Sequence, residues 1–572
     1  MTAKLAGSLI VECLIAQGVE VAFGVPGESY LPVLEGFHEH RDKIRFITCR
    51  QEGGAAFMAE AHGKLTGRPG VCLVTRGPGA TNAAIGVHTA FQDSTPMVLL
   101  VGDVGADFRH REAFQEIEYT SMFGPSTTGL AKRVERIDDA TRIPEYISRA
   151  FATAMNGRPG PVVLVLPEDM LHQHVDARPL PRAQVSQAGL APTAVRELDA
   201  LLQAAERPLV IAGGRWSPDG ACALQAFAEA WQLPVGNAFR FQDVFDNHHA
   251  LYAGDVGIGI NPKLARTIRD CDLLIAIGAR LGEMTTSGYS LLTVPQPSQK
   301  LVHIHPCADE LHRVYRADLA ICATADAAAH SLQDLVPPPA VRWASWAQAV
   351  HADYEANLMP EALPGLDPTS EGSVDMPAIV AELQRQLPAD AVLTNGAGNF
   401  ASWTHRYFRY HGMAKGHKTQ LAPTNGAMGY GIPAAVAANL TTGRVAFTIS
   451  GDGDFLMNGQ ELATAAQHGA KLIVLLLNNG MYGTIRMHQE REYPQRVSGT
   501  MLINPDFCAL ARAYGMHAEP VKDAAAFKEA LRAALGREQG TLIEIKLSPE
   551  VISTRVTLGA ITQQALQRAR SS

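Results

Sequence analysis

The chain lacks long hydrophobic runs, paired cysteines and an excess of positive charge. No apolar stretch reaches the roughly 18 residues of a membrane-spanning helix, and residues 1–20 lack the continuous apolar core and cleavage site of a signal peptide. The eight cysteines stand singly with no CxxC pair, which predicts reduced thiols in a cytoplasmic protein. The 49 Lys and Arg against 57 Asp and Glu give a formal charge of −8, which disfavours nucleic acid and anionic membranes as partners. These features exclude the membrane, secreted and disordered classes.

Short apolar segments instead alternate with helical patterns along the whole chain. With 572 residues, of which 47% are hydrophobic, the length suits three or four domains of about 150 residues each. Strands alternating with helices predict parallel sheets covered by helices on both faces. We therefore expect an α/β protein of three doubly wound domains.

Strand candidates recur in each third of the chain. They span 19–24, 44–49, 70–75, 97–102 and 162–167, then 208–214, 272–280 and 301–306, and finally 391–396, 444–450, 471–479 and 541–547. Helices are expected at 51–67, 81–92 and 341–358, and the polar segment 172–192 is typical of a linker. These patterns predict domains at 1–175, 190–337 and 355–550, followed by an amphipathic helix in 551–572 that forms a tail or a lid.

Two polar turns follow two strong strand candidates in the last third. Asp452 lies between Gly451 and Gly453, and Asn479 lies between Asn478 and Gly480. Open parallel sheets bind ligands at the carboxyl ends of their strands, so both turns are expected at one edge. Their oxygen ligands suit Mg²⁺, and the glycines would let a phosphate approach the backbone. Each turn sequence is common by itself, so the alternative is two unrelated turns.

This pair of turns resembles the diphosphate-binding motif of thiamine diphosphate enzymes, and the resemblance to their acetolactate synthase-like branch (the large catalytic subunit type) covers nearly the whole chain. It is carried by FGVPGE (23–28), QEGGAAFMAEAHGKLTGRPGV (51–71), RGPGATNA (76–83), AFQE (113–116), GRPGPV (157–162), GAR (278–280), GAMGYGIPAA (426–435) and NGQELATA (458–465). It implies a pyrimidine-binding domain, a central domain and a domain that binds diphosphate and Mg²⁺. It also implies a homodimer or homotetramer in which two subunits build each active site.

The resemblance implies a role for individual residues. Glu52 matches the glutamate that hydrogen-bonds the cofactor pyrimidine and promotes the imino form, which removes the C2 proton. Phe114 and Gln115 match a pair typical of acetolactate synthases, with Gln115 steering the intermediate. The implied cofactor contacts are Gly79, Asn82, Gly398, Asn399, Phe400, Gly426, Met428, Gly453 and Asp454; the implied Mg²⁺ ligands are Asp452, Asn479 and the main-chain oxygen of Met481; and the substrate pocket is assigned to Val25, Gly27, Arg76, Thr484 and His488.

Asp454 fits this pattern poorly. Many relatives have a small or hydroxyl residue at this position, and a carboxylate beside a diphosphate is repelled by it. We therefore expect the Asp454 side chain to point away, so that only its N–H faces the diphosphate.

Three departures concern the substrate. Gly129, Met284 and His488 stand where biosynthetic acetolactate synthases, which serve branched-chain amino acid synthesis, have lysine, arginine and tryptophan. The scaffold of a carboligase is thus present without these three specificity residues. Arg486 and Tyr482 are further candidates for the substrate pocket, and each could equally be a structural residue. The resemblance implies decarboxylation of a pyruvate-like 2-oxo acid with carboligation to an acetohydroxy acid or acyloin. The alternatives are a non-ligating decarboxylase of a larger or polar 2-oxo acid and a non-catalytic paralogue.

Weaker signals concern other cofactors. The segment 254–261 has the wrong glycine spacing for a dinucleotide loop. His303, His305 and Cys307 alternate on one strand, where metal ligands would share a face. A non-redox FAD in the central domain is compatible with 213–215 and 278–280, and the sequence leaves it open.

Overall fold

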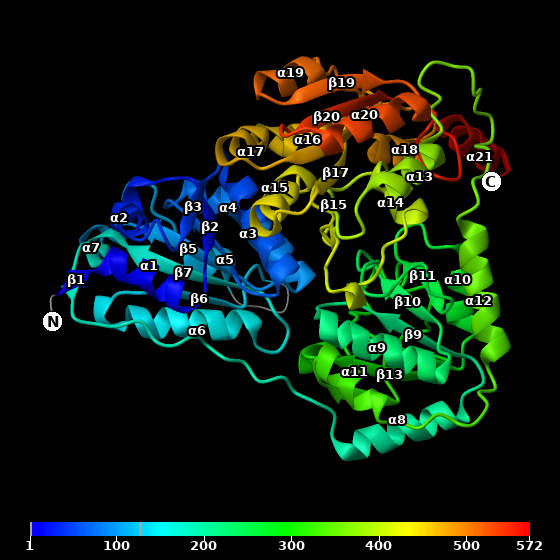
Figure 1. Ribbon diagram of the computed structural model, residues 1–572, viewed down its shortest axis with the longest axis horizontal. Helices are drawn as coiled ribbons and strands as arrows, with labels where there is room; N and C mark the ends of the chain where they lie inside the picture. The colour runs from blue at the N-terminus through cyan, green and yellow to red at the C-terminus, as the bar shows by residue number, and fades with distance from the viewer. Residues whose placement is uncertain (1–2, 125–128, 572) are drawn as a thin grey trace. The chain divides into compact units, whose positions relative to one another are not determined.

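The structure, a computed structural model, describes residues 3–124 and 129–571. It contains three six-stranded sheets, each flanked by helices (Figure 1), and it divides into two compact units. The first unit comprises 1–186, 423–443 and 456–472, and the second comprises 187–422, 444–455 and 473–572. In the described part of the chain, no helix combines the length and the apolarity needed to cross a membrane.

The first unit is built on the sheet β3-β2-β4-β5-β7-β6, whose strands pair in parallel. Ile10, Val33 and Ile147 of its helices pack on one face of this sheet. Its elements are β1 (Lys4–Leu5), α1 (Ala6–Ala16), β2 (Val21–Gly24), α2 (Leu31–Glu39), β3 (Arg45–Thr48), α3 (Glu52–Thr66), β4 (Gly70–Val74), α4 (Pro78–Asp93), β5 (Met97–Asp103), α5 (Tyr119–Phe123), β6 (Arg133–Arg136), α6 (Ile143–Met155), β7 (Pro161–Pro167), α7 (Glu168–Leu171), β8 (His174–Val175), α15 (Gly431–Thr442) and α17 (Leu462–His468).

The second unit begins with the central sheet, β11-β10-β9-β12-β13-β14. Alternate residues of its strands enter two cores: Val210 and Ile275 pack on one face, and Ile211 and Leu274 pack on the other. This is the packing of a doubly wound sheet. Its elements are α8 (Pro192–Ala204), β9 (Pro208–Ala212), α9 (Pro218–Trp231), β10 (Val235–Ala238), β11 (Tyr252–Val256), α10 (Pro262–Asp270), β12 (Leu273–Ile277), β13 (Lys300–His305), β14 (Leu319–Cys322), α11 (Ala325–Gln333) and α12 (Ala344–Asn357).

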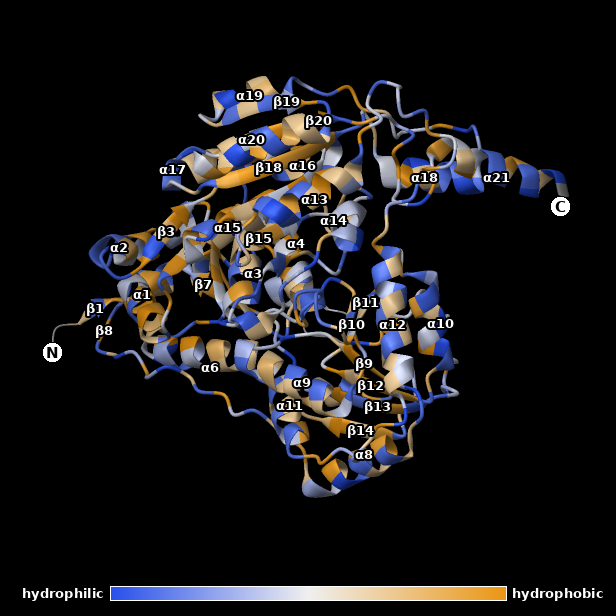
Figure 2. Cartoon of the chain, turned by 45° about the vertical axis from the view of Figure 1, so that its right-hand side comes forward, coloured by the Kyte–Doolittle hydropathy of each residue, from blue (hydrophilic) through white to orange (hydrophobic). Residues whose placement is uncertain are grey.

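The third sheet has the order β16-β15-β17-β18-β20-β19. Its central strand β18 is strongly hydrophobic along its length (Figure 2), and its residues Leu472–Leu477 are buried. The elements are α13 (Met376–Gln386), β15 (Val392–Asn395), α14 (Ala401–Tyr407), β16 (Gln420–Leu421), β17 (Ala446–Gly451), α16 (Asp452–Asn458), β18 (Leu472–Asn478), α18 (Gly483–Glu492), α19 (Phe507–Ala513), β19 (His517–Val521), α20 (Ala524–Gly536), β20 (Thr541–Lys546) and α21 (Leu558–Ser571).

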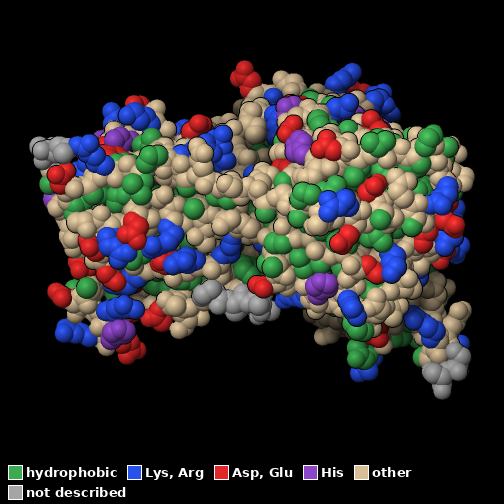
Figure 3. Space-filling model, turned by 90° about the horizontal axis from the view of Figure 1, so that it is seen from below, with side chains coloured by type: hydrophobic (Ala, Val, Ile, Leu, Met, Phe, Trp, Pro, Cys, Tyr) green, Lys and Arg blue, Asp and Glu red, His purple; other side chains and the backbone are tan. Residues whose placement is uncertain are grey.

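The expected α/β class with three mainly parallel sheets is confirmed, and every strand and helix candidate corresponds to an observed element. The domain boundaries 1–175, 190–337 and 355–550 stay a prediction. The tail forms the expected helix α21, which packs through Leu558 and Ile561 against Met481 and Ile552. The face of the molecule in Figure 3 carries Lys and Arg side chains interspersed with Asp and Glu, without a dominant charge.

In each sheet the strand order reverses near the middle, between β2 and β4, between β9 and β12, and between β15 and β17. In open α/β sheets the crevice outside the carboxyl ends of such a strand pair is the usual ligand site. The loops that follow these six strands are therefore the candidate ligand-binding loops.

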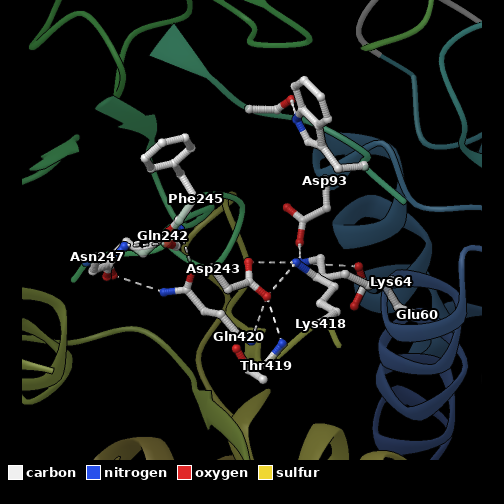
Figure 4. Close-up of polar contacts among 12 residues, drawn as sticks. Glu60, Lys64, Asp93, Gln242, Asp243, Phe245, Asn247, Lys418, Thr419 and Gln420 are labelled. Atoms are coloured by element: carbon white, nitrogen blue, oxygen red, sulfur yellow. Dashed lines mark hydrogen bonds and ion pairs between the residues drawn. The ribbon is translucent and has the colours of Figure 1, made fainter. Parts of the chain in front are cut away.

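A buried ion pair joins two segments of the second unit (Figure 4). The ammonium of Lys418 lies 3.0 Å from Asp243, whose Oδ2 also accepts hydrogen bonds from the N–H groups of Thr419 and Gln420. Because every partner of this carboxylate is a donor, the pair is satisfied and fixes β16 to the segment after β10.

Candidate active site

Asp452 lies at the end of β17, beside the strand-order reversal of the third sheet, and is 2% exposed. Its Oδ2 accepts hydrogen bonds from Gly480 N at 2.8 Å and from Asn504 Nδ2 at 2.7 Å, and its Oδ1 accepts one from Gly453 N. Burial raises the pKa of Asp452, and these three donors oppose that rise. The structure thus brings together the two polar turns, because Gly480 directly follows Asn479.

Asn504 is a member of this cluster that sequence reasoning missed. Its amide nitrogen bridges Asp452 and Asn478, while its Oδ1 is buried without a hydrogen-bond partner among the described residues. An orphaned oxygen beside a buried carboxylate offers ligands to a hard cation. Its sequence signal is only the turn dipeptide Asn504-Pro505.

Asp454 is buried, and the expectation that only its N–H faces a diphosphate stays a prediction. It is 3% exposed, and its carboxylate accepts hydrogen bonds from Ser450 Oγ at 2.6 Å and Ala397 N at 3.3 Å. A Cβ on Gly396 would lie 2.0 Å from Asp454 Oδ1, so the loop after β15 needs glycine there. The carboxylate therefore holds the 396–398 loop against β17.

Residues assigned to the diphosphate and to the substrate meet in the third domain. Asn399 N and Oδ1 both lie 3.0 Å from Thr484 Oγ1, and Asn399 Nδ2 donates to Ile552 O of the tail. Phe400 lies against Gly398 and Gly451, which have no side chains to block it. Thr484 thus supports Asn399 rather than standing free.

The segment after β18 carries the remaining assigned residues of this domain. Met481 is 4% exposed and forms an isolated bridge with Met501, and Asn479 is half-buried beside it. His488 is exposed on α18, whereas Arg486 is paired with Glu490 at 2.7 Å. Arg486 thus has an ion-pair partner on its own helix, and a role in the substrate pocket stays a prediction.

Glu52 opens helix α3 in the first unit. Its Oε2 accepts a hydrogen bond from Asn82 Nδ2 at 2.9 Å, and a Cβ on Gly79 would lie 3.4 Å from its Oε1. Three residues assigned from sequence are thus in one place, at the N-terminal turns of α3 and α4. The helix N-terminus favours a carboxylate at this position.

Glu461 caps the same helix, and it was not among the residues assigned from sequence. Its carboxylate is fully buried and accepts hydrogen bonds from the N–H groups of Arg50 and Gln51, the latter at 3.0 Å. Burial raises the pKa of Glu461. It fixes the turn that carries Glu52, and its only sequence signal was its place within 458–465.

The β2–β4 reversal gathers the substrate-pocket candidates of the first domain. Val25 and Gly27 follow β2, and Arg76 follows β4, where its guanidinium lies 3.1 Å from Glu168 and 4.0 Å from Glu28. Nε of Arg76 is buried without a partner among the described residues. Arg76 is thus paired at its two terminal nitrogens and keeps Nε without a partner among the described residues, a pairing that sequence alone did not show.

Gln115 and Phe114 lie on the loop after β5. Gln115 adopts a φ of 65°, and its carbonyl oxygen would lie 2.5 Å from a Cβ on Gly77, so the two backbones are in close contact. Tyr119 OH accepts a hydrogen bond from Gly77 N, while the Phe114 side chain is 75% exposed. The Gln115 backbone therefore reaches the reversal point, and Phe114 faces solvent. Gly129 lies just before β6, where it is half-buried.

Gly426 and Met428 lie on the 424–430 loop, which precedes α15. Gly426 is exposed and Met428 is half-buried. They lie between Thr424 and Tyr430, each of which donates a hydrogen bond to a buried carboxylate. These partners belong to the first unit and are described below.

The central sheet has polar groups near the carboxyl ends of β10 and β11, beside its reversal point. The loops after β9 and β12 touch, since a Cβ on Gly214 would lie 2.4 Å from Gly278 O. The Asn237 side chain is buried without a partner among the described residues, next in register to Asp255. Burial raises the pKa of Asp255 to about 8. This edge offers a neutral amide and a protonatable carboxyl to a ligand.

The histidine-rich strand β13 does not form a metal site. His303 Nε2 lies 3.0 Å from Ala279 O, and His305 Nδ1 accepts a hydrogen bond from Cys307 N. Within residues 3–124 and 129–571, the group of three metal-capable side chains is instead Asp246, His248 and His411, in which the two rings stack at 4.6 Å.

The donor sets suit thiamine diphosphate and Mg²⁺. Asp452 and the orphaned Asn504 oxygen supply hard ligands, and Gly396, Gly398, Gly451 and Gly453 leave the backbone open to a diphosphate. Glu52, held by Asn82, carries a carboxylate of the kind that the N1′ atom of a pyrimidine would need as a partner. The residues therefore fit the group that the sequence suggested.

Comparison with known proteins agrees with this geometry. Family models match the N-terminal TPP binding domain of thiamine pyrophosphate enzymes at residues 5–122, the central domain at 195–333 and the C-terminal TPP binding domain at 396–545. An acetolactate synthase large subunit of Parasynechococcus marenigrum is 32% identical over 94% of this chain and 86% of its own length. Acetolactate synthase isozyme 2 large subunit of Escherichia coli is 28% identical over 98% of both chains. A probable acetolactate synthase large subunit of Methanocaldococcus jannaschii is 31% identical over 94% of this chain and 91% of its own.

The fold, the site and these similarities lead to one conclusion: the chain belongs to the family of thiamine pyrophosphate enzymes that includes the acetolactate synthase large subunits.

Proposed function

We propose that the protein decarboxylates a pyruvate-like 2-oxo acid and ligates the remaining two-carbon unit to a second carbonyl compound, as an acetolactate synthase-like carboligase. The observation that carries this proposal is the pair of half-sites at strand-order reversals, with Glu52 held by Asn82 in one and Asp452 held by Asn504 in the other. The relatives are named as acetolactate synthases, so a non-ligating decarboxylase is not favoured.

Thiamine diphosphate, when bound, supplies the carbon–carbon bond chemistry. Asp452, Asn479 and the main-chain oxygen of Met481 would hold Mg²⁺, with Asn504 orienting Asp452 and offering its own oxygen, which has no partner among the described residues. Glu52 would hold a hydrogen bond to N1′ of the pyrimidine, and Asn82 keeps its carboxylate in place. A non-redox FAD would lie at the carboxyl edge of the central sheet, where the Asn237 side chain on β10 has no partner among the described residues.

Substrate residues in this proposal come mainly from the first domain. Arg76 remains partly unpaired at Nε and would bind the 2-oxo acid carboxylate. Gln115 would orient the reacting group, while Met284 cannot supply the bidentate contact of an arginine to a second oxo acid. A second subunit would complete each active site, which makes the protein a homodimer or homotetramer. Its eight unpaired cysteines suit the reducing cytoplasm.

The test is product formation from pyruvate with and without thiamine diphosphate and Mg²⁺. The proposal expects acetolactate only when both are present, and a loss of product in Glu52→Gln. Acetolactate formation by Glu52→Gln at the wild-type rate would contradict the assignment of the base.

A further inference from the structure

The 424–430 loop is held at both ends by buried carboxylates of the first unit. Its backbone is irregular, with φ of +71° at Gly426 and +76° at Gly429. Thr424 and Tyr430 lie at its two ends, and between them Gly426 is exposed and Met428 is half-buried. The loop is irregular, so side-chain contacts set its position: Asn458 Nδ2 donates to Gly429 O at 3.0 Å, and two carboxylates hold the two ends.

Glu60 holds the Tyr430 end. The Glu60 carboxylate is fully buried in α3 and accepts hydrogen bonds from Tyr430 OH at 2.5 Å and Thr95 Oγ1 at 2.7 Å. The ammonium of Lys64, one turn later on α3, lies 3.5 Å from Glu60. Burial raises the pKa of Glu60, and Lys64 opposes that rise.

Asp93 holds the Thr424 end. Its carboxylate, at the last residue of α4, accepts hydrogen bonds from Thr424 N at 2.8 Å and from Thr424 Oγ1. Lys64 also pairs with Asp93 (Figure 4), so one ammonium serves both carboxylates. Asn425, next along the loop, donates to Thr89 Oγ1 at 3.0 Å.

The network is satisfied and buried, which makes it rigid. Two carboxylates share one cation, and each remaining partner is a hydroxyl or N–H donor. Breaking one contact in such a network leaves a buried charge without compensation, which is far costlier than losing a surface pair. The same two helices carry Glu52, Gly79 and Asn82 at their other ends. Glu60 lies about 12 Å along α3 from Glu52, at 1.5 Å per residue.

We propose that Glu60, Lys64 and Asp93 are positioning residues that hold the 424–430 loop in the register needed to bind the cofactor. The proposal rests on the proposed function, because it takes Gly426 and Met428 as the cofactor contacts of this loop. The three residues act through Tyr430 and Thr424 and touch no reacting atom.

Two substitutions, each of which removes one hydrogen-bond donor of the Glu60 carboxylate, distinguish a role in positioning the loop from a contribution to stability alone. Tyr430→Phe removes the hydroxyl that connects Glu60 to the loop, and Thr95→Val removes the other hydroxyl, which lies between α4 and β5. Both cost Glu60 one hydrogen bond, so both are expected to lower Tm to a similar extent. Thiamine diphosphate affinity, measured by calorimetry with Mg²⁺ on the full chain, is expected to fall about tenfold in Tyr430→Phe and less than twofold in Thr95→Val. Thr424→Val tests the other end and is expected to weaken affinity similarly.

The outcomes are distinguishable. Wild-type affinity in Tyr430→Phe with a lowered Tm would make the network purely structural and overturn the proposal. An equal loss of affinity in Thr95→Val would also overturn it, because the loss would then not depend on the contact between Glu60 and the loop. A wild-type protein that binds no thiamine diphosphate would refute the proposed function itself.

Discussion

Replacing Glu52 by glutamine tests the assignment of the base with little disturbance of the fold. The Glu52 carboxylate accepts one hydrogen bond, from Asn82 Nδ2 at 2.9 Å, and a glutamine oxygen accepts the same bond. The change removes the negative charge, and with it the charge-assisted character of this bond and the interaction with the helix N-terminus. Together these losses amount to about 1–2 kcal/mol of unfolding free energy.

The expected effect on proton transfer is much larger. General acid–base catalysis by a positioned side chain contributes about 10²–10⁴-fold, so exchange of the cofactor C2 proton should slow by at least about 100-fold in Glu52→Gln. Cofactor affinity should fall by less than about tenfold, the equivalent of one hydrogen bond. The assay is deuterium exchange at C2 of bound thiamine diphosphate, stopped with acid and read by NMR.

Glu12→Gln is a matched control, because Glu12 of α1 pairs with Lys4 of β1 and is not part of the site. It should exchange at the wild-type rate. Exchange in Glu52→Gln within about threefold of wild type would refute the reasoning.

Two further predictions concern the metal and the pH dependence of stability. In Asp452→Asn the amide nitrogen cannot accept the bonds from Gly480 and Asn504, and the charge that binds Mg²⁺ is lost. Mg²⁺ with thiamine diphosphate at 100 times Kd should stabilise the wild type by about 2.7 kcal/mol and the variant by almost nothing, as measured by thermal unfolding with and without EDTA. Burial lowers the pKa of His405 to about 3, so the unfolded state binds its proton first and stability falls as pH drops below about 6.5. Between pH 7 and 5 this histidine should cost about 2 kcal/mol of unfolding free energy, which His405→Gln should abolish.

Each of these predictions has a clear opposite result. If Mg²⁺ stabilised Asp452→Asn as much as the wild type, the metal would have to bind at another site. An unchanged pH slope in His405→Gln, measured by denaturant unfolding, would show that this ring titrates normally in the folded protein.

The strands that the sequence predicted are those with a strong apolar pattern. The missed ones are mostly edge strands: β6 (Arg133–Arg136) is charged, β16 has two residues, and β19 contains Pro520. β11 and β14 are also edges, and β10 is short and contains glycine. An edge strand needs less apolar surface and tolerates proline. The alternation and the hydrophobicity of its residues therefore predict it only weakly.

Local motifs predicted the site residues better than their long-range partners. Asp452 and Glu52 stand in short patterns after a strand or at a helix start, which sequence displays directly. Asn504 reaches Asp452 from a segment that is held beside the loop after β18 by the pairing of Met501 with Met481. Glu168 pairs with Arg76 from 92 residues away. Such pairings depend on tertiary folding and leave no local pattern.

The most direct test of the central claim is NMR of ¹³C-labelled pyruvate incubated with the purified protein, thiamine diphosphate and Mg²⁺. A carboligase produces acetolactate together with CO₂, and this is the result that the account predicts. Acetaldehyde and CO₂ without any acetolactate would contradict it, because the protein would then cleave the 2-oxo acid and not ligate the product.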